Sequence, residues 1–207
     1  MPSGRTHDRI TLWSLPVVAG LTLGFTQSSK FTLLVASGFL FSGLMFGPDL
    51  DLNSLPYKRW GFLRWIWLPY QKTLRHRSIW SHGLVIGTTI RVVYLLGCVA
   101  IALLLAFDIC ELLGFVDGWS WSLLAGEVKR SLFSHPLEWI SLFTGLELGS
   151  MSHYLSDWGG SSYKRFKAGG IAAVMPKLPK TKKRKRKPSK PILKKRSTKT
   201  PKTRKKE

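Results

Sequence analysis

The stretch LRHRSIWSHG, residues 74–83, leads directly into the most hydrophobic part of the chain. Residues 83–107 contain a single charged residue, Arg91. Most of the others are apolar or small, and two are threonines. A helix needs about 20 mostly apolar residues to cross a bilayer, so we predict a membrane-spanning helix over residues 83–107. We expect Arg91 to be a structural residue that snorkels or pairs.

Two shorter apolar runs, residues 10–25 and 31–46, precede this span, and a polar break at residues 27–30 separates them. Each run is slightly shorter than a helical crossing requires. They form either a tight helical hairpin, or one helix and one interfacial piece, or internal helices of a soluble protein. Another apolar helix is expected over residues 136–151. The predicted fold class is all-α, a multi-helix membrane-embedded domain with about three to four apolar helices.

Residues 49–77 mix aromatic with basic side chains. Trp, Tyr and Arg together are typical of a membrane–water interface. The same mixture also binds single-stranded nucleic acid, but the adjoining apolar segments favour the membrane. Loops rich in Lys and Arg remain in the cytoplasm. This rule places the 49–77 connection and the basic C-terminal tail there, with the acidic loop at residues 108–117 outside. A hairpin over residues 10–46 returns the N-terminus to the cytoplasmic side.

The charge is concentrated at the C-terminal end of the 207-residue chain. The whole chain carries a formal net charge of +21, and residues 177–207 hold 17 Lys and Arg with one acid, a net charge of +16. A segment this polar, with no aromatic residue, cannot bury enough surface to offset its ordering entropy. We therefore predict a helical membrane domain over residues 1–176 and a disordered basic tail over residues 177–207. The tail is suited to anionic lipid or nucleic acid, and the sequence indicates no specific protein partner.

Histidines and aspartates gather where the apolar runs end, and the predicted topology places all of these ends on one face of the membrane. Imidazole together with carboxylate suits zinc, manganese or iron. Taken singly, such residues are more often caps or hydrogen-bonded structural groups, but their concentration favours a common site. The candidate metal ligands are His7, Asp49, Asp51, His76, His82, His153 and Asp157.

The spacing of these residues constrains the site. His153 and Asp157 are four residues apart and share one face of a helix, whereas His76 and His82 are six apart and do not. We place His76 in the connection and His82 in the first turn of the long span. The candidates exceed the four ligands of a structural zinc site, so the site holds either two metals that share carboxylates or one metal with supporting partners. Asp8 is expected at most to support a ligand, and His135 to be a helix-entry residue.

Four motifs in this order resemble a known family. They are SGRTHD at residues 3–8, DLD at 49–51, RHRSIWSH at 75–82 and SHYLSD at 152–157. This combination is similar to bacterial and cyanobacterial metal-binding proteins of unknown function, the DUF2227 family, and more loosely to predicted membrane-bound metal-dependent hydrolases of the YdjM type. The likeness covers roughly residues 3–160 and excludes the basic tail. It implies a helical, membrane-embedded domain with a His/Asp metal centre.

These observations favour an integral protein of a bacterial inner, plasma or thylakoid-type membrane that binds one or two divalent ions and acts as a metal-dependent hydrolase. His76 is the candidate catalytic residue, as a ligand or proton donor. Arg75 and Arg77 flank it and either bind an anionic substrate, such as a phosphoester or lipid headgroup, or form a basic face towards lipid phosphate. The alternative is a non-catalytic, metal-stabilised scaffold, sensor or metal handler. The chain has no nucleophile triad pattern, phosphate-binding glycine loop or dinucleotide fingerprint.

Overall fold

The computed structural model describes residues 4–74, 78–115 and 121–174, and these residues form helices with no β-strand among them. The all-α prediction is therefore confirmed. The long helices are α1 (Gly4–Thr26), α2 (Ser29–Leu44), α6 (Ile86–Leu112), α7 (Trp121–Ser134) and α8 (Pro136–Val174). Between α2 and α6 lie the short helices η1 (Pro48–Asp51), α3 (Leu55–Arg59), η2 (Gly61–Trp67), α4 (Leu68–Thr73) and α5 (Ile79–His82).

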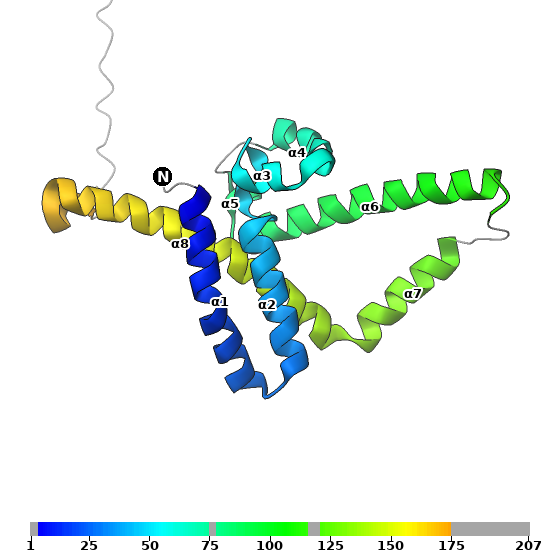
Figure 1. The fold of residues 1–207 in the computed structure, drawn as a ribbon, viewed down its shortest axis with the longest axis horizontal. Helices are drawn as coiled ribbons and strands as arrows, with labels where there is room; N and C mark the ends of the chain where they lie inside the picture. The colour runs from blue at the N-terminus through cyan, green and yellow to red at the C-terminus, as the bar shows by residue number, and fades with distance from the viewer. Residues whose placement is uncertain (1–3, 75–77, 116–120, 175–207) are drawn as a thin grey trace, which may run out of the picture. The chain divides into compact units, whose positions relative to one another are not determined.

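Helices α1 and α2 form a hairpin, the first of the three arrangements considered for these apolar runs, and lie side by side (Figure 1). The turn between them uses Gln27 in a left-handed backbone conformation, with φ of 49°. A hairpin brings the start of α1 and the end of α2 to the same end of the pair. Thr11 of α1 packs directly against Gly43 of α2, where an added Cβ would lie 2.7 Å from the threonine Oγ1. The two apolar runs are thus paired, and residues before α1 and after α2 meet.

Three segments of the described chain are long and apolar enough to cross a membrane: Gly4–Thr26, Ser29–Asp51 and Ile86–Leu112. The third is α6, which extends five residues beyond the predicted end at residue 107. Asp108 and Glu111 therefore lie in the last turns of this helix, and the expectation that they begin an acidic loop was wrong. A helix continues as long as its backbone bonds are made, and two acids near its exposed end do not stop it.

Helix α8 crosses α2 through glycines that allow close backbone contact. An added Cβ at Gly38 would lie 2.7 Å from the carbonyl oxygen of Leu142, and those at Gly145 and Gly149 would clash with backbone oxygens of α2. Gly145 and Gly149 form a small-xxx-small pattern, which lets two helices approach without side chains between them. The helix is much longer than the predicted 136–151 and runs straight through Gly159 and residue 160, which were expected to form a joint. Gly169 and Gly170, the second expected joint, are non-helical.

The aromatic connection between α2 and α5 folds into a core of its own. Phe46, Leu50, Tyr57, Trp67 and Tyr70 are buried together, and Trp67 makes edge-to-face contacts with neighbouring rings. Burial raises the pKa of the Tyr70 phenol to about 12. Tyr57, Trp67 and Tyr70 thus pack inside the protein, while the position of this segment at a membrane interface stays a prediction. Phe62 and Trp65 do face outward, 80% and 61% exposed.

Candidate metal centre

Four separate elements deliver the predicted ligands to one place. His7 lies in the first turns of α1, Asp49 and Asp51 in η1, and His82 in α5. His153 and Asp157 lie on α8, four residues apart on one helical face as predicted. His82 is not in the first turn of the long span, since α5 ends before α6 begins at Ile86. The candidates His76, Arg75 and Arg77 lie outside the described residues.

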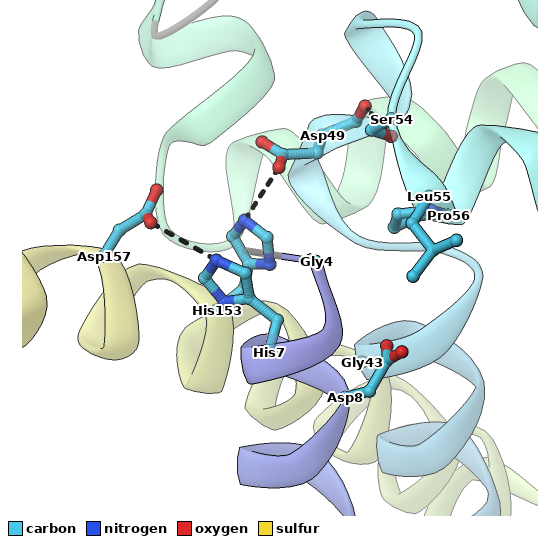
Figure 2. Close-up of a pocket in the computed structure, with 10 residues that line it drawn as sticks. All are labelled: Gly4, His7, Asp8, Gly43, Asp49, Ser54, Leu55, Pro56, His153 and Asp157. Atoms are coloured by element: carbon cyan, nitrogen blue, oxygen red, sulfur yellow. Dashed lines mark hydrogen bonds and ion pairs between the residues drawn. The ribbon is translucent and has the colours of Figure 1, made fainter. Parts of the chain in front are cut away.

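His7, His153 and Asp157 form the most compact group. Each residue offers one ligand atom, and these three atoms lie within 4.8 Å of one another. The two imidazole rings stack with centroids 3.9 Å apart and planes inclined by 16°. The Nε2 atom of His7 lies 3.4 Å from Oδ1 of Asp157. Figure 2 shows the stacked rings, with Asp49 facing one of them and Asp157 the other. Both histidines are buried, at 7% and 4% exposure.

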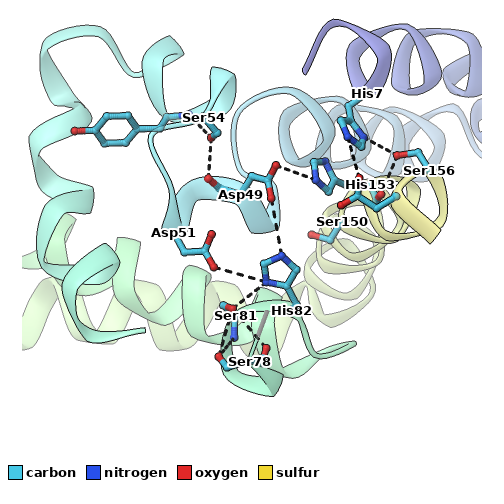
Figure 3. Close-up of polar contacts among 12 residues, drawn as sticks. His7, Asp49, Asp51, Ser54, Ser78, Ser81, His82, Ser150, His153 and Ser156 are labelled. Atoms are coloured by element: carbon cyan, nitrogen blue, oxygen red, sulfur yellow. Dashed lines mark hydrogen bonds and ion pairs between the residues drawn. The ribbon is translucent and has the colours of Figure 1, made fainter. Parts of the chain in front are cut away.

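Asp49 lies between this group and His82 (Figure 3). One carboxylate oxygen, Oδ2, is 3.2 Å from Nε2 of His153, and the other, Oδ1, is 3.9 Å from Nε2 of His82. The second ring nitrogen of His82, Nδ1, is 3.7 Å from Oδ2 of Asp51. The side chain of Asp51 is fully buried. Asp49 therefore connects histidines from α5 and α8.

Serine hydroxyls fix the rings of two histidines. Ser156 Oγ donates to the carbonyl oxygen of His153 at 2.8 Å and lies 2.5 Å from Nδ1 of His7. Assigning the Ser156 proton to this carbonyl makes the hydroxyl an acceptor from His7 Nδ1, and this assignment leaves the lone pair of His7 on Nε2. Ser81 Oγ lies 2.9 Å from Nδ1 of His82 and donates to the carbonyl oxygen of Ser78.

The short helix η1 is held from both sides, which fixes its two aspartates. Leu50, between them, is fully buried in the aromatic core. Gln71 Nε2 donates to the carbonyl oxygens of Leu50 and Leu52, and Ser54 Oγ donates to that of Asp49 at 2.7 Å. Anchoring the middle residue in the core while bonding its backbone leaves both carboxylates directed at the histidines.

The residues present fit a divalent metal ion. Nε2 of His153 and Oδ1 of Asp157 are both buried, yet neither has a hydrogen-bond partner among the described residues. Each of the two atoms faces an atom of opposite character, Asp49 Oδ2 at 3.2 Å and His7 Nε2 at 3.4 Å, without making a hydrogen bond within the described chain. Buried polar atoms without hydrogen bonds are rare and call for an explanation such as an ion. Imidazole nitrogens with carboxylate oxygens are the donor set preferred by zinc and by the mid-row transition metals. A cavity of about 170 Å³ adjoins these atoms and is lined also by Asp8 and Ser54 (Figure 2).

The residues expected to be peripheral are paired elsewhere. Asp8 faces the cavity but forms a two-pronged ion pair with Arg59, at 2.9 and 2.5 Å. His135 precedes α8 and lies 3.4 Å from Glu138, as a helix-entry residue would. These contacts keep both side chains out of the His/Asp cluster.

Sequence reasoning missed a buried polar network behind the cluster. Arg91 is fully buried and donates to the carbonyl oxygen of Ser81 and to the hydroxyls of Thr88 and Ser150. Ser150 in turn bonds Ser42 of α2 at 3.0 Å. Arg91 is thus structural, as predicted, but it does not snorkel. A lone arginine inside an apolar run, with hydroxyls in the facing helices, is the signal that would have indicated this network.

Comparisons with known proteins agree with this geometry. A stretch of 59 residues is 41% identical to an uncharacterized protein of Aquifex aeolicus (strain VF5), covering 28% of this chain and 41% of that protein's length. No solved structure matches the chain. The family model of the uncharacterized metal-binding proteins, DUF2227, matches residues 2–167, four-fifths of the chain. The chain therefore belongs to this family of metal-binding proteins.

Proposed function

We propose that the protein is an integral membrane, metal-dependent hydrolase that acts on phosphoesters or lipid headgroups. One observation carries the proposal. His7, Asp49, His153 and Asp157 come from three separate elements, and buried Nε2 and Oδ1 atoms among them have no hydrogen-bond partner although a cavity adjoins them. A set of electron-pair donors beside a cavity is suited to hold an ion that a small substrate group can reach.

The chain's own residues have distinct tasks in this proposal. His7, His153, Asp157 and Asp49 hold the ion. Ser156 keeps the His7 lone pair on Nε2. The chemistry that a divalent ion supplies is Lewis-acid activation of water and of a phosphoryl or acyl oxygen. The metal is zinc, manganese or iron on the basis of its donor set.

The cavity is large enough for the reacting group of such a substrate. Its volume of about 170 Å³ admits a phosphate-sized group. Asp8 lines it, with Arg59 paired to this carboxylate at 2.9 Å. The arrangement favours a small reacting group at the metal, with the rest of a larger substrate outside the cavity. His76 remains the candidate ligand or proton donor from the sequence, with Arg75 and Arg77 as candidate anion-binding residues.

The test is a hydrolysis screen on purified full-length protein in detergent. Substrates are p-nitrophenyl phosphate, bis(p-nitrophenyl) phosphate and phosphatidic acid micelles, each with zinc, manganese or iron and with a chelator. Turnover that requires metal and is lost in His153→Ala supports the hydrolase. His76→Ala is expected to lower turnover; an unchanged metal content would identify His76 as the proton donor, and a lost ion would identify it as a ligand. A metal-loaded, folded protein without turnover, which unfolds on chelation, contradicts the hydrolase and favours the metal-stabilised scaffold, sensor or metal handler.

Membrane insertion is supported by the three apolar helices, and the Lys/Arg-rich segments favour a cytoplasmic position for the metal centre and the C-terminus of a bacterial membrane protein. A reporter fused to residue 207 that is active only in the cytoplasm tests this orientation. We also propose that residues 177–207 bind anionic lipid or nucleic acid. Deleting them is expected to abolish binding to anionic nanodiscs or to duplex DNA, whichever the intact protein binds, while sparing metal content.

A further inference from the structure

The His/Asp cluster divides into two sets of donor atoms. The first consists of His7, His153 and Asp157, whose donor atoms lie within 4.8 Å of one another. The second contains His82, whose Nε2 faces Asp49 Oδ1 at 3.9 Å. That separation is too long for a hydrogen bond between the two atoms.

Asp49 belongs to both sets. Its Oδ2 faces His153 and its Oδ1 faces His82 (Figure 3). The two oxygens of a carboxylate offer lone pairs in diverging directions, so one aspartate can serve two ions at once. Shared carboxylates of this kind are the usual link in two-metal sites.

The second ring nitrogen of His82 is already committed. Nδ1 lies 2.9 Å from Ser81 Oγ and 3.7 Å from the buried Oδ2 of Asp51. A histidine whose far nitrogen meets a hydroxyl and a carboxylate has its ring fixed and its other nitrogen made more basic, as in carboxylate–histidine–metal arrangements. Asp51 is therefore a positioning residue for His82, whose Nε2 faces the shared aspartate.

We propose that the protein has a second divalent metal site at His82, with Asp49 shared between this ion and the ion held by His7, His153 and Asp157. This inference rests on the metal binding of the proposed function. The second ion has fewer described protein ligands than the first, His82 and Asp49, and so leaves more positions for water and substrate.

Metal stoichiometry tests the second site without any assay of activity. Purified full-length protein in detergent is stripped with a chelator, loaded with excess manganese(II), desalted and measured by elemental mass spectrometry and electron paramagnetic resonance. We expect two equivalents in the wild type, with the broadened spectrum of coupled ions. His82→Ala is expected to keep one equivalent with the sharp six-line spectrum of isolated manganese(II). Asp51→Asn is expected to weaken binding of only the second equivalent, about 10- to 100-fold.

The control is His135→Ala, which removes an exposed histidine outside the cluster and is expected to retain two equivalents. Circular dichroism confirms that each variant is folded. One equivalent in the saturated wild type, or two in folded His82→Ala, overturns the second site. Two equivalents without turnover on any tested substrate uphold the second site and count against the hydrolase alone. No metal in the folded wild type overturns both.

Discussion

Two buried polar regions lie next to each other, and their atoms are arranged in opposite ways. In the network around Arg91, the two terminal guanidinium nitrogens donate to the hydroxyls of Thr88 and Ser150 and to the carbonyl oxygen of Ser81, so donors face acceptors there, although the Arg91 Nε makes no hydrogen bond within the described chain. In the His/Asp cluster, ring nitrogens face carboxylate oxygens, and buried atoms of His153 and Asp157 make no hydrogen bond within the described chain. The first arrangement holds helices together by itself. The second gathers electron-pair donors, which suits it to a ligand that accepts them.

The contrast predicts two kinds of variant. Changes in the Arg91 network should lower stability whether or not metal is present. Changes in the His/Asp cluster should lower metal affinity and leave the metal-free protein about as stable as before, because removing an unsatisfied buried group costs little.

The largest effect is expected at the crossing of α2 and α8, on which both polar regions depend. Gly145→Val places a side chain against the carbonyl oxygen of Val35, a backbone atom that cannot move aside without separating α2 from α8. We expect a loss of about 3 kcal/mol or more, with loss of metal as well. Size-exclusion chromatography in detergent and metal content measure both. The matched control is Gly159→Ala on the same helix, where an added Cβ meets nothing within 4 Å. An unaffected Gly145→Val would contradict the close crossing.

Next in size is Arg91→Met, which removes the buried cation but keeps an apolar side chain in its place. It leaves the hydroxyls of Thr88 and Ser150 with fewer partners, and we expect a loss of about 2–3 kcal/mol. Thermal unfolding followed by circular dichroism, with and without chelator, checks this. The loss should be the same in both conditions. A loss that appears only when metal is bound would place Arg91 in the metal centre instead.

Chelation of the wild type is expected to lower its stability by about 2–3 kcal/mol if the metal had been present at roughly 100 times its dissociation constant. The reason is that an ion bound only to the folded protein stabilises it by mass action. The same treatment of Asp157→Asn should change its unfolding midpoint much less. Equal shifts in the two proteins would show that the metal binds somewhere other than beside Asp157.

A smaller effect is expected from Ser156→Ala, which removes the hydroxyl at Nδ1 of His7. The histidine then loses the group that fixes its tautomer, and we expect metal affinity to fall about 10-fold. Competition with a fluorescent zinc chelator measures the change. Ser152→Ala is the control, because the bond that the Ser152 hydroxyl makes among the described residues is to the carbonyl oxygen of Gly149, one turn back on the same helix. Equal metal affinity in both variants would show that the Ser156 hydroxyl does not support metal binding by His7.

The smallest effect is expected from Glu138→Gln, far from both polar regions in sequence and contacts. The hydrogen bond from Lys30 holds the pKa of Glu138 below its usual range. A carboxyl with a lowered pKa in the folded protein stabilises it above its ordinary pKa, and this contribution is lost as the pH falls through the lowered value. The wild type and the variant should therefore differ slightly at pH 7 and converge at acidic pH. A difference that grows on acidification would contradict the ion pair.

Much of this organisation was predictable because it follows from local pattern. The length and apolarity of residues 83–107 indicated α6, and the break at residues 27–30 indicated the α1–α2 hairpin. His153 and Asp157 were placed on one face by helical spacing alone. The proximity of His7, Asp49 and His82 was predicted because each lies at the end of an apolar run and the predicted topology places these ends on one face of the membrane.

The remaining features depend on contacts between distant segments. Trp67 and Trp65 are two residues apart, yet one is buried and the other exposed; the choice is made by the aromatic core that Trp67 joins. Gly145 and Gly149 are required for close helix packing only because α2 lies against them. The role of Arg91 likewise depends on hydroxyls from other helices, which a reading of its own segment could not supply.

The most direct test of the metal centre is the metal content of the purified wild type beside His153→Ala and Asp157→Asn, each checked for folding by circular dichroism. The arrangement of donor atoms predicts that folded wild type carries at least one equivalent of zinc, manganese or iron and that both folded variants lose it. A well-folded wild type that binds none of these metals after reconstitution, or variants that bind as much as the wild type, would contradict a metal centre at these residues.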